Sequence, residues 1–227
     1  MGYLCATTSK NISIFTESMK SVQVPSKWSD VSMRQFMAYV AMMEESGDET
    51  EKVFATISIM TGADVDEVKA WNMDSFNKVW STLGFLTTDI VAKRSAEVKL
   101  ANGKTYKVVS NPSMGMSYGA FIDLMHNVKD SETAKKNLNK AFACMLIEKP
   151  KWFWQAAKYD GKDYKEKCTL VFDLPVTVVK PHTDFFLQNY LRYSKSLLVY
   201  SALYMKATKW KKKVKAAFTP NTDGLTL

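Results

Sequence analysis

Apolar residues recur at helical spacing along the first ninety residues of the chain. The first stripe contains Phe36, Val40 and Met43, which lie four and three positions apart. Three more stripes follow, made of Val53, Phe54, Ile57 and Met60; of Val68 and Trp71; and of Phe76, Val79, Trp80 and Leu83. Because helices this short are unstable alone, the pattern predicts four helices that share one core.

Residues typical of helix starts stand before these stripes, and glycines follow three of them. The expected N-caps are Ser29-Asp30, Asp48, Asp64 and Asp74. We expect Gly47, Gly62 and Gly84 to end the first, second and fourth helices, because glycine readily takes the left-handed conformation that closes a helix.

The period of the apolar positions changes from 3.6 to 2 in residues 97–109, around the turn signal Asn102-Gly103. A two-residue loop would place Val98 opposite Lys107. A three-residue loop with a left-handed glycine would place Val98 opposite Tyr106. The second register puts the apolar groups on one face, so we favour it. A lone hairpin is marginally stable, so this one must pack on the helices or on a neighbouring subunit.

Helical stripes return after the hairpin. They hold Phe121, Leu124 and Met125, starting near Ser117; Leu138, Phe142 and Met145, ending before Pro150; and a last long stripe from Phe186 to Tyr204, capped by Thr183 or Asp184. Residues 168–179 fit either a short strand or a helix followed by a turn. The chain is therefore expected to be mainly α, a compact helical domain with a β-hairpin insertion around residues 97–109. Its two halves, residues 1–95 and residues 96–227, would form one continuous structural unit.

Charge is distributed unevenly along the 227 residues. The net charge is +8, but residues 1–100 carry −3 and residues 101–227 carry +11. No carboxylate occurs between Phe185 and Thr222, and this stretch contains a candidate basic surface of Lys206, Lys209, Lys211, Lys212, Lys213 and Lys215. Such a segment is either a solvated helix face or a surface for phosphate or for the acidic half of another copy.

The residues that catalysis needs do not occur in the usual patterns. Gly103-Lys104-Thr105 lacks the earlier glycine of a phosphate-binding loop, because Val98 stands there. The two histidines, His126 and His182, and the three unpaired cysteines have no metal-site spacing, and Cys144 has the neighbours of an inert core thiol. We expect no enzyme, no catalytic residue, no cofactor and no metal. No apolar window reaches about 18 residues, so we also expect no membrane partner.

Three groups of apolar residues are candidate contacts with other proteins. They are the hairpin residues Val98, Leu100, Tyr106 and Val108; the aromatic patch Trp152, Phe153 and Trp154; and Trp210, Val214 and Phe218 in the basic segment. Aromatic residues among lysines also stack on the bases of single-stranded nucleic acids, so a nucleic-acid role is an alternative.

Several segments resemble small helical proteins from the morphogenesis gene clusters of tailed phages, in particular crAss-like phages of gut Bacteroidales. The similar segments are Trp28-Ser29-Asp30-Val31-Ser32-Met33-Arg34-Gln35-Phe36, Ile57-Ser58-Ile59-Met60-Thr61-Gly62, Met116-Ser117-Tyr118-Gly119-Ala120-Phe121-Ile122-Asp123-Leu124 and Asp184-Phe185-Phe186-Leu187. The N-terminal helices are also similar to siphovirus tail-assembly chaperones. The likeness covers residues 28–90 and 112–190.

This resemblance implies a virion structural protein, assembled in the host cytoplasm. The chain would be a ring or adaptor subunit in the portal–tail region. Its partners would be copies of itself in a ring of twelvefold order, the portal, and neighbouring tail or ring proteins. The alternatives are a tail-assembly chaperone that does not stay in the virion and a basic module that binds nucleic acid, with weak DNA contact through its lysines.

Overall fold

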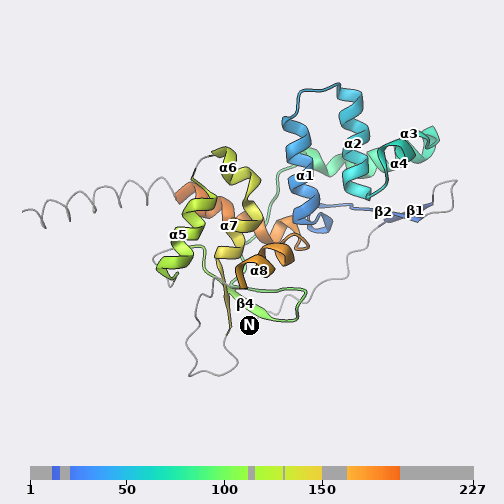
Figure 1. The fold of residues 1–227 in the computed structure, drawn as a ribbon. Helices are drawn as coiled ribbons and strands as arrows, with labels where there is room; N and C mark the ends of the chain where they lie inside the picture. The colour runs from blue at the N-terminus through green and yellow to red at the C-terminus, as the bar shows by residue number, and fades with distance from the viewer. Residues whose placement is uncertain (1–11, 16–20, 112–115, 130, 150–162, 190–227) are drawn as a thin grey trace, which may run out of the picture. The chain divides into compact units, whose positions relative to one another are not determined.

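The computed structural model (Figure 1) describes residues 12–15, 21–111, 116–129, 131–149 and 163–189. The chain divides into two compact units, residues 1–184 and residues 185–227. The architecture below belongs to the first unit. The aromatic patch at 152–154 and the basic segment at 206–218 lie outside the described residues, so the structure says nothing of their roles.

The fold is mainly helical, as the sequence pattern predicts. Within the described residues, the labelled α-helices are α1 (Met33–Glu44), α2 (Glu49–Thr61), α3 (Val65–Lys69), α4 (Met73–Thr82), α5 (Tyr118–Asn127), α6 (Ser131–Lys136), α7 (Leu138–Cys144) and α8 (Tyr164–Val171). Residues 176–189 form a further helix, and the 3₁₀-helices are η1 (Trp28–Asp30) and η2 (Leu83–Thr87). The strands are β1 (Ile12–Phe15), β2 (Ser21–Val24), β3 (Glu97–Lys99), β4 (Thr105–Val108) and β5 (Leu146–Glu148).

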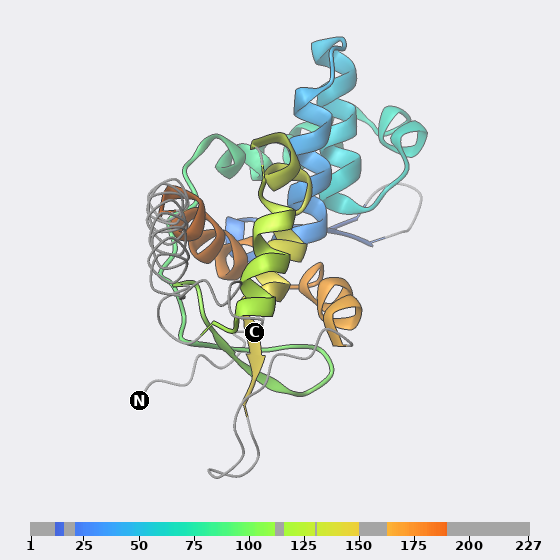
Figure 2. The same ribbon diagram turned by 60° about the vertical axis from the view of Figure 1, so that its left-hand side comes forward.

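Phe54 joins three of the four N-terminal helices. Helices α1 and α2 lie side by side in both views (Figure 1 and Figure 2). From α2, the Phe54 ring meets Phe76 of α4 edge-to-face, with ring centroids 5.6 Å apart, and Lys69 of α3 lies 5.6 Å from its centroid. Gly62 ends α2 with φ of 75°, the left-handed cap that its position predicts. The expected sharing of one core by short helices is thus observed.

The hairpin has the register favoured on hydrophobic grounds. Val98 pairs with Tyr106, and Gly103 takes φ of 77° in a three-residue loop closed by Leu100 and Lys104. A third strand, β5, pairs with β4, so the sheet order is β3-β4-β5. The sequence pattern missed β5, because its residues continue the apolar run of α7.

Helix α7 is the most deeply buried segment of this unit. Every residue from 141 to 147 is buried, including Phe142. The helix packs against α5 and α8, and the chain continues from it into β5 (Figure 2). Burial of a Phe-sized side chain stabilises a fold by about 2–3 kcal/mol, so Phe142 gives α7 a substantial hydrophobic contribution to stability.

Several expected helix boundaries are wrong. Helix α1 begins after Ser32 instead of Ser29-Asp30, and α4 begins after Asn72 instead of Asp74, since the side chains of Ser32 and Asn72 accept the capping hydrogen bonds. Thr183 and Asp184 lie inside the helix at 176–189 and therefore do not cap it. For residues 168–179, the structure shows the second alternative, a helix followed by a turn.

Candidate functional site

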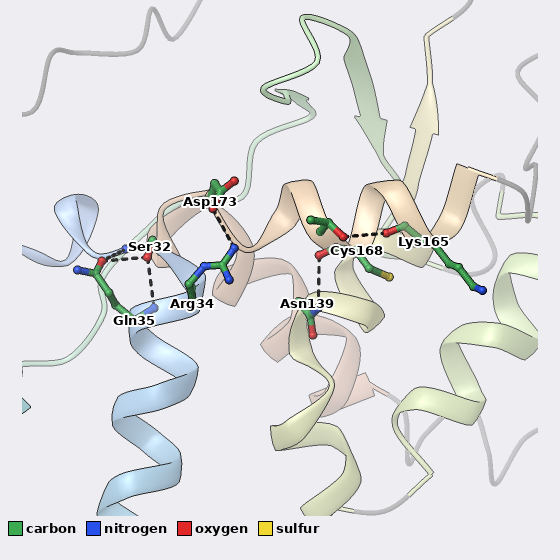
Figure 3. A network of polar contacts seen from close by, with 8 residues as sticks. Ser32, Arg34, Gln35, Asn139, Lys165, Cys168 and Asp173 are labelled. Atoms are coloured by element: carbon green, nitrogen blue, oxygen red, sulfur yellow. Dashed lines mark hydrogen bonds and ion pairs between the residues drawn. The ribbon is translucent and has the colours of Figure 1, made fainter. Parts of the chain in front are cut away.

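The first turn of α1 is held by the turn that follows α8 (Figure 3). The amides of Met33 and Arg34 donate to the carbonyls of Leu174 and Phe172, at 2.7 and 3.0 Å. The other two amides at this helix start are satisfied within α1: Gln35 donates to the Ser32 hydroxyl at 3.2 Å, and Ser32 donates to the Gln35 side-chain oxygen at 2.9 Å. All four amides that a helix start leaves free therefore have partners.

Further contacts strengthen this junction. The amide of Val176 donates to the carbonyl of Val31 at 2.9 Å. The Arg34 guanidinium lies 3.4 Å from the Asp173 carboxylate and 5.1 Å from the centre of the Phe172 ring. Since Arg34 and Asp173 are exposed, their ion pair adds little, and the backbone hydrogen bonds make the connection.

Trp28 and Gln35 connect the same segment to other elements. The Trp28 ring lies between Phe36 and Phe85, at 6.0 and 5.3 Å between centroids, and its indole N–H donates to the carbonyl of Thr88 at 2.9 Å. The Gln35 amide donates to the carbonyl of Met60 at the end of α2, at 2.9 Å. Residues 28–36 therefore join α1 to α2, to η2 and to the turn after α8.

A polar cluster lies between α5, α7 and α8. The Asn127 amide donates to the Tyr164 hydroxyl at 2.9 Å and lies 3.9 Å from the Cys144 sulfur. Burial raises the pKa of Cys144 to about 12, and burial also raises the pKa values of Cys168 and Tyr164. Thiols in this state are poor nucleophiles, so the cluster is a structural one. On a neighbouring part of the interface, Asn139 of α7 donates to the carbonyl of Cys168 at 3.4 Å (Figure 3).

The two histidines have different surroundings. His126 is exposed near the end of α5. His182 is 2% exposed and lies inside the helix at residues 176–189. Its ring packs on Phe142 at 5.7 Å between centroids, and neither ring nitrogen has a hydrogen-bond partner among the described residues. Burial, with help from the charge of Arg94, lowers the pKa of His182 to about 4.

The apolar residues of the hairpin face the interior of their own chain. Val98, Leu100, Tyr106 and Val108 are all buried, and the Lys167 ammonium of α8 lies 5.5 Å from the centre of the Tyr106 ring. The other face of the sheet carries exposed Lys99 and Lys107. Contact of the hairpin with another chain stays a prediction. The four apolar residues predicted to make this contact are already packed inside their own chain. Another chain can therefore reach only the opposite, exposed face of the hairpin.

Two polar contacts link the segments of the sheet. One joins the hairpin loop to β5, and the other joins the residue after β5 to β3. The Lys104 ammonium donates to the Glu148 carboxylate at 3.0 Å, and this hydrogen bond and charge raise the pKa of Lys104. The Lys149 ammonium lies 2.8 Å from the Glu97 carboxylate. These pairs are exposed, so each contributes little to stability.

Two helices each carry a pair of large apolar side chains that stay exposed, and Met43 of α1 and Val91 are single exposed apolar residues. On α4, Met73 is 70% exposed and Trp80 is 42% exposed; they lie seven positions apart and so share one face of the helix. On α5, Tyr118 is 79% exposed and Ile122 is 46% exposed, one turn apart. We call these the α4 face and the α5 face. The sequence pattern had counted Trp80 as core.

No group of three or more His, Cys, Asp or Glu side chains placed to hold a metal ion occurs in the described parts of the chain. Within the same residues, no helix is both long enough and apolar enough to cross a bilayer. Comparison of the chain with protein-family models, curated proteins and solved structures gives no match. The α4 and α5 faces are therefore the features on which a functional proposal has to rest.

Proposed function

We propose that the chain is a non-enzymatic structural protein of a tailed bacteriophage, a ring or adaptor subunit of the portal–tail region. The observation that carries this proposal is the pair of uncovered apolar faces on α4 and α5. A subunit of a closed ring touches its two neighbours through two different surfaces, and these faces lie on different helices. The phage setting comes from the sequence resemblance.

The residue types on these faces suit protein contacts. Trp, Tyr and Met are enriched at the centres of protein interfaces, where a buried aromatic anchor contributes most of the binding energy. Trp80 and Tyr118 are such anchors, and each has a large apolar neighbour on the same face, Met73 and Ile122. Covering these side chains would remove apolar surface from water, and this drives association.

The internal chemistry supports a structural role. The thiol of Cys144 is buried, with its pKa raised to about 12, and the imidazole of His182 is buried, with its pKa lowered to about 4. At neutral pH the Cys144 thiol is protonated and is therefore not the thiolate nucleophile. The His182 imidazole is neutral, but it is buried and only weakly basic, which does not suit a general base. Asn127, Tyr164 and the residues of the α1 junction are engaged in hydrogen bonds within the chain.

The test has two parts. Mass spectrometry of purified virions is expected to find the protein in several copies per particle. Sedimentation velocity of the purified chain is expected to show association that depends on concentration, and Trp80→Ser and Tyr118→Ser should each weaken it at least about tenfold. A protein that is absent from particles and monomeric at high concentration would end the proposal.

Two alternatives give different results in the same work. A tail-assembly chaperone would be abundant in infected cells but absent from virions. A nucleic-acid-binding module is favoured only by the carboxylate-free stretch between Phe185 and Thr222. It would bind DNA with a steep dependence on salt, and removal of residues 206–227 would abolish that binding.

A further inference from the structure

We propose that the α4 face of one copy binds the basic segment, residues 206–218, of a second copy. This inference rests on the proposed ring function and names one of its contacts. The contact is heterologous, because the two partners contribute different surfaces, and it can therefore repeat from copy to copy around a ring.

The α4 face lies beside the side of the helix that packs on the domain. Val79 is fully buried, and Phe76 meets the Phe54 ring of α2. Met73 and Trp80 lie next to these residues at two-turn spacing, with small polar Asn77 between them, and both stay exposed. The domain therefore leaves room for an apolar ligand that spans about two helical turns.

The stretch of sequence around this face is acidic. Residues 28–90 contain eleven carboxylates and four basic side chains, a net charge of −7. Three of these carboxylates, Glu44, Glu49 and Glu51, are paired with lysines of the same chain. Among the exposed carboxylates that form no ion pair with a described residue are Asp66 in α3, Asp74 in α4 and Asp89 after η2. The uncovered apolar face is thus flanked in sequence by unpaired negative charge.

The basic segment has the complementary pattern. Trp210, Val214 and Phe218 lie at i, i+4 and i+8, which is the spacing of one apolar helix face. Six lysines occur between residues 206 and 215, and no carboxylate occurs between Phe185 and Thr222. Apolar anchors of this spacing fit a face with large side chains two turns apart, and the lysines fit a surface of net negative charge.

The experiment uses charge reversal in the full chain. One variant carries Asp66→Lys, Asp74→Lys and Asp89→Lys, and the second carries Lys211→Glu, Lys212→Glu and Lys213→Glu. Each variant alone has like charges on both partners, so its dissociation constant in sedimentation velocity should rise at least about tenfold. A control variant with Lys93→Glu, Lys129→Glu and Lys140→Glu reverses three exposed lysines elsewhere and should associate as the unmodified chain does.

Mixing the two variants gives the decisive measurement. In the mixture, the reversed, basic face of the first variant meets the reversed, acidic segment of the second. The unmodified acidic face of the second variant meets the unmodified lysine segment of the first. Association should therefore return to within about threefold of the unmodified chain. This recovery also shows that both variants are folded. Trp80→Ser should weaken association in the mixture as well.

Any other result contradicts the proposed α4 contact. Such a result can be distinguished from a failure of the ring proposal itself. If the unmodified chain associates and the two variants associate equally well, or the mixture does not recover, then the α4 contact is wrong while a ring subunit remains supported. If the unmodified chain is monomeric and either reversal lowers its thermal stability, the segment binds its own chain. If it is monomeric without such an effect, the contact does not form. The presence of the protein in virions decides the function independently.

Discussion

The buried imidazole of His182 should make the stability of the protein depend on pH. Burial is the main reason that its pKa falls to about 4 from the ordinary 6.5, the charge of Arg94 acts in the same direction, and the backbone of Ser95 acts in the opposite one. With neither ring nitrogen hydrogen-bonded among the described residues, a proton on this ring would be a poorly compensated buried charge. The folded protein therefore holds His182 neutral.

The sign and size of the effect follow from these pKa values. The unfolded chain takes up the proton near pH 6.5, while the folded protein resists protonation until about pH 4. The stabilisation is fully present above pH 6.5 and is lost as the pH falls toward 4. At about 1.4 kcal/mol for each pH unit, the whole window is worth roughly 3 kcal/mol, and the part between pH 7 and pH 4.5 is worth about 2 kcal/mol.

Urea unfolding between pH 7 and pH 4.5 tests this reasoning. Carboxylates also titrate at the acid end, so the informative quantity is the difference between the unmodified chain and His182→Leu. That difference should change by about 2 kcal/mol over the range, with the variant losing less stability as the pH falls. His126→Gln is the matched control, because His126 is exposed, and its curve should run parallel to that of the unmodified chain. Parallel curves for His182→Leu would refute the assignment.

Two further predictions concern local structure, and both use equilibrium unfolding. Ser32→Ala should cost about 1 kcal/mol, and a double-mutant cycle with Gln35→Ala should give a coupling of at least about 0.5 kcal/mol because the two side chains cap α1 together; additive effects would contradict the capping box. Gly103→Ala should cost about 1–2 kcal/mol because φ is 77°, whereas Gly47→Ala should stay within about 0.5 kcal/mol. Equal effects at both glycines would disprove strain as the cause.

Local chemistry explains which parts of the fold the sequence could predict. The hairpin register follows from Asn102-Gly103 and from the need to place Val98 and Tyr106 on one face, and the structure confirms it. The end of α2 at Gly62 can likewise be predicted from nearby residues, because it requires only the left-handed conformation of that glycine. In both cases a few adjacent residues contain all the information.

The parts that could not be predicted depend on residues far apart in the chain. Strand β5 has a sequence that continues the apolar run of α7, and it becomes a strand because it pairs with β4 about forty residues earlier. The start of α1 was misplaced because several capping residues stand close together, and the carbonyls of Phe172 and Leu174 favour the start after Ser32. Of the candidate contacts, Trp80 was expected in the core, since helical spacing alone does not tell which apolar residues find a partner.

The contacts of residues 28–36 change what the phage resemblance can be taken to mean. In this stretch Val31, Met33 and Phe36 are buried, Ser32 and Gln35 cap α1, and Trp28 packs between Phe36 and Phe85. Each of these residues has a role inside the chain, so a similar stretch in another protein indicates a similar helix junction before it indicates a similar assembly. Evidence for assembly has to come from side chains that the fold does not need. Met73, Trp80, Tyr118 and Ile122 are candidates, because their own chain leaves 42–79% of each residue exposed.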